Sequence, residues 1–485
     1  MSDNLSVKDG LRSAVFCVIL VFGIAGTIIA QDVFGTKDLT PSSPASPLFD
    51  DKTSTFGPLS QPLTFREAME RALYNNPKTQ EAWATIKAQA AGVGIGYSAY
   101  LPTLSGTLQG AREVSKTDVN DNPQLNSDTW ANTNTESLSL SWVLYDFGGR
   151  DAGLENAKEL LAAARANHEV TLRDVFSAVA KDYYAAQAAQ GNFATAAENE
   201  RIAKDSFNAA SQRVEKGVSP ISDQLQADTA RYQAVVSLTK AEGDWHIATG
   251  TLAVDMGLRP DALIILPEVD DGVKPDETFQ QSVSILIDNA IGQHPSVQVA
   301  QAQLKAAEDK VKQIRAGGLP TLSLVAESSR NDEPLNEEVG VSSFKATELE
   351  DYVGAKIDIP FFEGFSRTYQ IQQAQAQVEA QRDALNDARQ QVGLNVWESY
   401  QTLKSSSENI ANSAKLLDVA QKSYVAAQGR YLGGVGNMTE WLDAQTALAS
   451  ARFQWVKSLT DWRASRLELA SKLGEMDAWW IKENK

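Results

Sequence analysis

The 485-residue chain contains an internal duplication, and this repeat constrains the fold more than any other feature of the sequence. A glycine-containing stretch around Gly434 corresponds to one around Gly217, an offset of 434 − 217 = 217 residues. Glu440 and Asp223 are separated by the same 440 − 223 = 217 residues, so the register holds without a gap. Self-similarity at a fixed offset predicts two copies of one structural unit.

Each copy reads as helix, strand, strand and helix, which predicts a mainly α fold with a duplicated order of elements. The first copy covers 63–260 and the second 278–475, with a linker at 261–277. In each copy the longest helix is expected to span about 100 Å, at about 1.5 Å per residue. Helices this long with one apolar seam must pack side by side along their length, which predicts a cylinder whose wall is one helix thick.

Four segments have the period-two alternation of strands, at about 101–112, 136–147, 319–329 and 351–362. In the second of them, one face is predicted to carry Leu138, Leu140, Trp142 and Leu144, and the other Ser137, Ser139, Ser141 and Tyr145. A half-buried soluble hairpin is one interpretation, but an isolated hairpin is barely stable in water. We favour transmembrane strands, which need about 9–11 residues each.

Four strands cannot close a membrane barrel, because barrels begin at about eight strands. Open sheet edges are not tolerated in lipid. Several copies of the chain must therefore share one barrel, and the residues alone allow two, three or four copies.

The N-terminal region indicates export. An apolar run at 14–30 follows Lys8 and Arg12, which predicts a signal peptide at 1–30 and a flexible leader at 31–62; a C-terminal tail is expected at 476–485. Cys17 lies in the signal peptide, so the mature chain would hold no disulfide. The net charge of −18 argues against nucleic acid. The three histidines form no cluster, and no metal or cofactor is expected.

Several motifs at matching offsets resemble the outer-membrane efflux proteins, the TolC family. They are L-P-T-L-S at 101–105 and 319–323, Y-D-F-G-G-R at 145–150, F-F-E-G-F-S-R at 361–367, and R-Y-x-x-G followed by E-W-L-D-A-Q within 430–445. The resemblance covers about 63–475. It implies a homotrimer with a shared twelve-stranded β-barrel in the outer membrane of a Gram-negative bacterium. It also implies a periplasmic helical tunnel that meets a periplasmic adaptor (membrane fusion) protein and an inner-membrane transporter.

Two acidic residues follow the second glycine bend. Glu440 and Asp443 are three residues apart, so both lie on one helical face. The resemblance implies that three copies place these acids in a ring at the periplasmic gate, where they would favour cations. The alternative is a pair of solvated charges that stabilise the start of a helix.

The resemblance also assigns roles at the two hairpin tips. Asp223 and Tyr431 match linking positions, so we expect a hydrogen bond between them in the closed state. The family's basic gate residue corresponds to Gly436, which puts a salt-bridge lock in doubt. The turn residues expected to contact the adaptor are Gly217, Gly434, Arg213 and Arg430.

We therefore expect a passive exit duct for small-molecule or multidrug efflux. A similar duct serves type I protein secretion, and this alternative stays open. A surface coiled-coil protein for structure or adhesion is a more distant possibility. A periplasmic enzyme with the acidic pair as acid and base is disfavoured, because the two acids lie on a helix after a glycine bend and not in a pocket with a third orienting group. The sequence also has no P-loop, nucleophile–base pairing or metal-ligand spacing.

Overall fold

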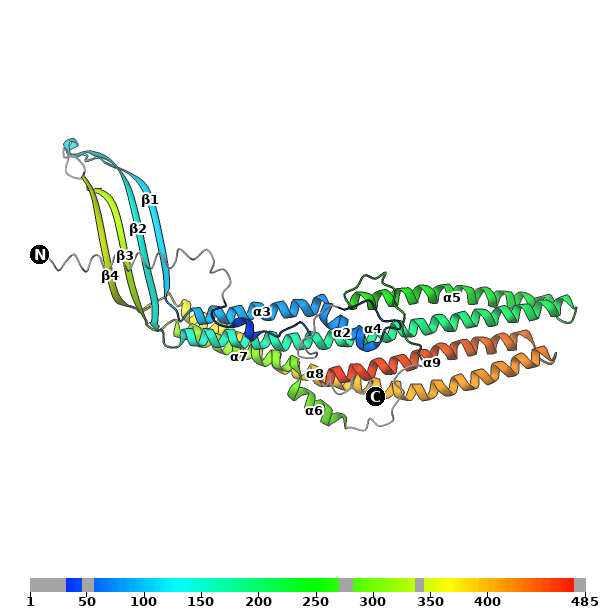
Figure 1. Cartoon of the computed structure of the whole chain (residues 1–485). Coiled ribbons are helices and arrows are strands. Elements are labelled where there is room, and N and C mark those ends of the chain that lie inside the picture. The colour runs from blue at the N-terminus through cyan, green and yellow to red at the C-terminus, as the bar shows by residue number, and fades with distance from the viewer. Residues whose placement is uncertain (1–31, 46–55, 270–281, 336–343, 475–485) are drawn as a thin grey trace.

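The computed structural model describes residues 32–45, 56–269, 282–335 and 344–474. The molecule is elongated, with a four-stranded sheet at one end and a bundle of helices running away from it (Figure 1). The predicted signal peptide, residues 475–485 and residues 270–277 of the predicted linker lie outside the described residues.

The helices follow the repeat. In the first copy they are α2 (Phe65–Asn75), α3 (Pro77–Ser98), α4 (Gly149–Glu215) and α5 (Ile221–Asp255), and in the second α6 (Val283–Gln293), α7 (Pro295–Ala316), α8 (Ser366–Leu432) and α9 (Met438–Leu473). Short 3-10 turns occur at Thr36–Leu39 (η1) and Pro123–Leu125 (η2). Prolines start α3 and α7, where the missing N–H costs no hydrogen bond. The helices α4 and α8 have 67 residues each, or about 100 Å.

The strands β1 (Thr103–Thr117), β2 (Ser127–Tyr145), β3 (Thr321–Leu335) and β4 (Phe344–Asp358) form one antiparallel sheet in chain order. The central pairing, β2 with β3, joins the two repeats. The strands extend beyond the predicted bounds into the polar segments between them. Backbone pairing continues there because ladder hydrogen bonds do not require apolar side chains.

One predicted side-chain orientation is wrong. A register shift between Val143 and Tyr145 makes a β-bulge, so that Tyr145 pairs with Leu322. Directly paired residues share a face, and Leu322 lies on the same face as Leu324, the partner of Trp142. Tyr145 therefore lies on the apolar face, and Leu144 is the extra residue of the bulge.

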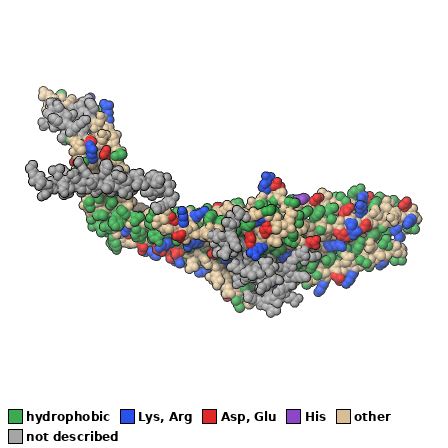
Figure 2. Space-filling model, in the orientation of Figure 1, with side chains coloured by type: hydrophobic (Ala, Val, Ile, Leu, Met, Phe, Trp, Pro, Cys, Tyr) green, Lys and Arg blue, Asp and Glu red, His purple; other side chains and the backbone are tan. Residues whose placement is uncertain are grey.

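The apolar face of the sheet is open in one protomer. Leu108 is 84% exposed and Val353 75% exposed. The other face is mainly polar: the hydroxyls of Ser105 and Ser139 lie 2.7 Å apart, and the Tyr352 hydroxyl donates to Glu327. Hydrophobic side chains gather where the sheet meets the helices (Figure 2). Such a sheet has one face suited to lipid and one to water.

The helices pack side by side. Next to the sheet, α3 and α7 lie along α4, and α7 also packs on α8; at the far end, α5 packs on α4 and α9 on α8 and α4. Among the described helices, none has an apolar stretch long enough to cross a bilayer.

Part of the stretch expected to be a flexible leader is held against the helices. The Trp83 indole donates to the Pro41 carbonyl, and His168 Nε2 lies 2.8 Å from the Pro44 carbonyl oxygen. The Phe34 ring stacks on Tyr97 at 5.7 Å between centroids. These contacts fix residues 32–45, which the Pro- and Ser-rich composition did not indicate.

Candidate gate at the helical hairpin tips

The two hairpin turns, α4–α5 and α8–α9, lie at the end of the molecule opposite the sheet (Figure 1). Gly217 and Gly434 have φ of 72° and 79°, the left-handed region that glycine enters at low cost. After each glycine the chain bonds back to the helix end: Val218 N–H donates to the Arg213 carbonyl, and Val435 N–H to the Arg430 carbonyl, both at 2.9 Å. The two turns therefore have the same construction.

In the described part of the chain, hydrogen bonds connect one hairpin tip to the other, and three of them have measured distances. The Tyr431 hydroxyl donates to Asp223 Oδ2 at 3.4 Å. Arg213 Nη1 donates to the Leu432 carbonyl at 3.3 Å, and the Thr439 hydroxyl donates to Gln226 Oε1 at 3.4 Å. The bonds are long, so each is weak, but all three span the same junction. The structure thus brings Asp223 and Tyr431 together within one protomer.

Tyr431 is the centre of this junction. It is only 2% exposed, its ring lies 5.2 Å from that of Trp441, and the Arg213 guanidinium lies 5.0 Å from its centroid. Burial raises the pKa of the Tyr431 hydroxyl, and the nearby Asp223 carboxylate adds to the increase. The hydroxyl is therefore protonated at neutral pH and able to donate.

The two acids occupy the first turns of α9. Asn437 caps this helix, since its side-chain oxygen accepts the Glu440 N–H at 2.7 Å. The Glu440 carboxylate lies 3.3 Å from Arg430 Nη1, whereas Asp443 is exposed and has no ion pair in the described part of the chain. The acids share a helical face but not an electrostatic environment.

Gly436 has little room for the side chain that the family pattern places there. A Cβ at this position would lie 3.0 Å from both Arg430 Cβ and the Tyr431 backbone nitrogen. The Gly436 N–H donates to the Arg430 carbonyl at 3.0 Å, which fixes the close approach. A basic gate residue at 436 would require this turn to shift.

Some contacts at the tips were not foreseen. Arg213 and Arg430 occupy equivalent repeat positions, yet Arg213 reaches to the other hairpin while Arg430 pairs within its own. The only signal in the sequence was the 217-residue offset, which predicts equivalence and not this divergence. No metal-binding group of His, Cys, Asp and Glu occurs among the residues whose structure is described.

Comparison with known proteins matches the repeat and the fold. The family model described as outer membrane efflux protein matches residues 68–258 and 286–475. Protein CyaE of Bordetella pertussis is 30% identical over 414 residues, covering 85% of this chain and 84% of that protein. Outer membrane efflux protein BepC of Brucella suis is 24% identical over 425 residues, covering 87% of each.

A solved structure agrees at the level of fold. The outer membrane protein VceC of Vibrio cholerae aligns with a TM-score of 0.67 and 18% identity, covering 84% of this chain and 96% of that chain. The predicted fold class and the family resemblance are both confirmed. Since the family model matches most of the chain, in both copies of its repeat, the protein belongs to the outer membrane efflux protein family of channel-forming exit ducts.

Proposed function

We propose that three copies of this chain form one duct that conducts substrates across the periplasm and the outer membrane of a Gram-negative bacterium. The observation that carries the proposal is the open sheet. In the described structure β1 and β4 each pair on one side only, and their apolar side chains are exposed. Lipid does not tolerate such unpaired edges, so neighbouring copies must cover them.

The two free edges are compatible with each other. Both β1 and β4 have 15 residues, and pairing β4 of one copy with β1 of the next extends the sheet in the same antiparallel order. Three copies supply twelve strands, which exceeds the minimum for a closed membrane barrel. The helices of the three copies then form the tunnel below it.

The hairpin tips form the entrance in this proposal. The Tyr431–Asp223 and Arg213–Leu432 bonds hold the closed state, and Glu440 and Asp443 of three copies surround the axis. The adaptor contacts the turns at Gly217, Gly434, Arg213 and Arg430, and the inner-membrane transporter supplies the energy. Opening separates the tips while the packing of the wall persists.

The duct is tested with the purified mature protein. We expect a trimeric mass in detergent and cation-selective single channels in planar bilayers. A monomer that stays in solution without detergent would overturn the proposal. Conductance also separates a duct from a surface coiled-coil protein.

For the cargo, we propose small molecules. Efflux is the activity in the name of the family and of BepC. Deletion of the gene should raise sensitivity to drugs, and the wild-type gene should restore resistance. An unchanged drug profile together with loss of a secreted protein would instead identify type I secretion.

A further inference from the structure

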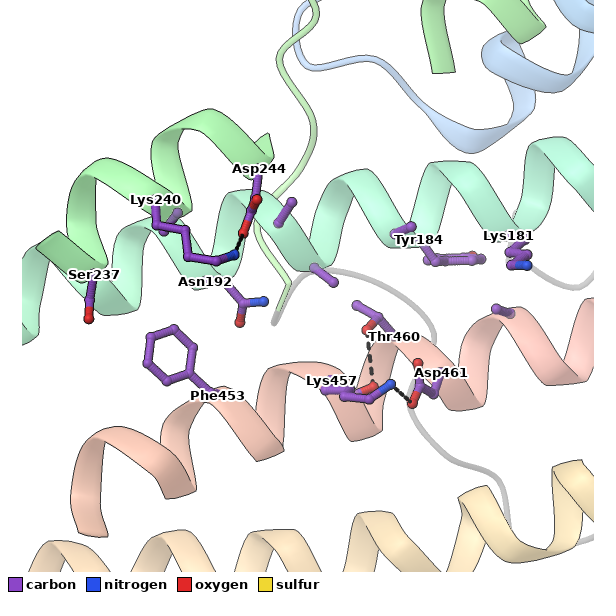
Figure 3. Close-up of a pocket in the computed structure, with 15 residues that line it drawn as sticks. Lys181, Tyr184, Asn192, Ser237, Lys240, Asp244, Phe453, Lys457, Thr460 and Asp461 are labelled. Atoms are coloured by element: carbon purple, nitrogen blue, oxygen red, sulfur yellow. Dashed lines mark hydrogen bonds and ion pairs between the residues drawn. The ribbon is translucent and has the colours of Figure 1, made fainter. Parts of the chain in front are cut away.

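A cavity of about 540 Å³ lies between α4, α5 and α9 (Figure 3). None of the residues that line it belongs to the hairpin turns. Its floor is made mainly of alanines, including Ala185, Ala188 and Ala241, whose small side chains leave the space open. Tyr184 and Phe453 supply aromatic surface at its two ends. The volume is within the range of sites that hold small organic ligands, about 300–1,000 Å³.

The repeat places equivalent ion pairs on opposite sides of this cavity. Lys240 pairs with Asp244 on α5, and Lys457 pairs with Asp461 on α9 at 2.7 Å. The offsets are 457 − 240 = 217 and 461 − 244 = 217, the offset of the duplication. Each pair is neutral, so these four residues alone do not favour a charged ligand.

Lys181 adds one further positive charge to the cavity. It lines the same cavity from α4, is exposed, and has no ion pair within the described residues. The cavity therefore carries three lysines against two aspartates, a net charge of 3 − 2 = +1, in a chain whose net charge is −18. A local cationic group over an apolar floor attracts an anionic amphiphile.

The opposite end of the cavity offers a second polar group. Asn192 Oδ1 is buried and accepts no hydrogen bond in the described part of the chain. Lys181 and Asn192 are eleven residues apart on α4, about 16 Å at about 1.5 Å per residue. A ligand with an anionic end and a hydrogen-bond donor at this distance would satisfy both groups.

We propose that this cavity binds an elongated organic anion, with its carboxylate or sulfonate at Lys181, its apolar body on the alanine floor, and an N–H or O–H donor at Asn192. Such a molecule contacts the wall of the duct and not its gate.

The cavity opens away from the linker between the repeats. Gln187 and Gln190 of α4 donate to the carbonyls of Pro267 and Leu266, on a different helical face from the one that bears Lys181 and Ala188. If the linker lay on the inner side of the helical wall, it would obstruct the duct. The linker therefore lies on the outer side, and the cavity, which faces the other way, opens to the lumen. This direction, unlike the binding itself, rests on the proposed trimeric duct.

Two probes with one skeleton test the site. 11-(Dansylamino)undecanoate has a sulfonamide N–H and a carboxylate at the two ends of a chain of ten methylenes, long enough to approach both Asn192 and Lys181, and N-dansyl-1,10-diaminodecane ends in an ammonium group instead. Both are titrated by fluorescence anisotropy into the full mature protein in lipid nanodiscs, with empty nanodiscs as the blank. The wild type is expected to bind the anion at least about tenfold more tightly, the effect of one charge-assisted contact.

Lys181→Glu should reverse that preference, and Ala185→Trp should weaken both probes by filling the cavity. Lys204→Glu, a charge reversal at an exposed α4 residue outside the cavity, should change neither. Equal binding of the two probes, or binding that Lys181→Glu and Ala185→Trp leave intact, overturns the site. The oligomeric mass and the channel conductance are measured on the same samples. If the protein binds the anionic probe but is neither trimeric nor conducting, the duct is refuted and the site stands. If it is trimeric and conducting but does not bind the probe, the site is refuted and the duct stands.

Discussion

The guanidinium of Arg430 lies 3.3 Å from the carboxylate of Glu440, across the turn of the second hairpin. The next acid on the same helical face, Asp443, has no such partner within the described structure. The Arg430 and Glu440 side chains are 57% and 40% exposed, so the pair adds little to stability. It does place a positive charge beside one of the two acids proposed to form the entrance ring.

This asymmetry predicts unequal contributions to ion selectivity. Asp443→Asn is expected to remove more of the cation preference than Glu440→Gln, because Arg430 offsets the Glu440 charge. Arg430→Gln should increase the cation preference, whereas Arg430→Lys should preserve it. Reversal potentials in planar bilayers under a potassium chloride gradient measure each effect. Identical losses from the two acid variants would show that the pair does not form in the channel.

The junction between the hairpins predicts a looser entrance in Tyr431→Phe. This variant keeps the ring against Trp441 but removes the hydroxyl that donates to Asp223. The lost bond is long and is worth at most about 1 kcal/mol in each protomer, but it is lost in every protomer, so closed-state conductance should rise. Tyr232→Phe, at an exposed tyrosine of α5, is the control. Unchanged conductance in Tyr431→Phe would mean that this bond does not hold the gate.

The close packing at Gly436 predicts that a basic residue introduced there will not form the salt bridge that the family pattern places at the gate. Gly436→Arg brings a Cβ to 3.0 Å from Arg430 Cβ and the Tyr431 nitrogen, so these atoms must move apart by a few tenths of an ångström. Overpacking of this kind costs about 1–3 kcal/mol, and the melting temperature should fall. Gly429→Arg is the matched control, because a Cβ there has no neighbour within 4 Å among the described atoms. Equal melting temperatures for the two variants would contradict the steric argument.

The sequence was sufficient for features set by local rules. The repeat offset, the prolines at 77 and 295, and the bends at Gly217 and Gly434 fix which segments are helices and where they turn. Side-chain partners depend on tertiary geometry, which explains why the Arg430–Glu440 pair was not anticipated. The bulge before Tyr145 also escaped prediction, because alternation alone does not reveal an extra residue.

Two phenylalanines at the ends of the sheet predict an effect specific to lipid. Phe147 and Phe365 have φ of 51° and 64°, which costs about 1–2 kcal/mol for a residue with a Cβ. They are 365 − 147 = 218 residues apart, and Phe365 is 67% exposed. Aromatic side chains favour the membrane interface, so we expect contact with lipid there to offset the backbone cost at these two positions.

Replacing both phenylalanines with glycine should therefore lower thermal stability in lipid vesicles more than in detergent. The corresponding tryptophan double variant keeps the interfacial contact and serves as the control. Circular dichroism melts in the two media provide the comparison. A loss of the same size in both media would assign these residues to packing within the protein instead.

A carboxyl at the end of α5 predicts a pH-dependent stability. Burial raises the pKa of Asp255 from 3.8 to about 7, and the neighbouring Asp182 carboxylate adds to the increase. The folded state therefore holds more protons than the unfolded state between about pH 4 and 7, so stability is greatest below that window and falls as pH rises through it. After allowance for the partial exposure of the group, the loss is about 1–2 kcal/mol. Asp255→Asn should melt at a higher temperature than the wild type at pH 8 and at nearly the same temperature at pH 4.5. The control is Asp174→Asn, at an exposed site on α4, which should melt with the wild type at both pH values. If Asp255→Asn instead shifts the melting temperature equally at both pH values, the carboxyl is not the group that senses pH.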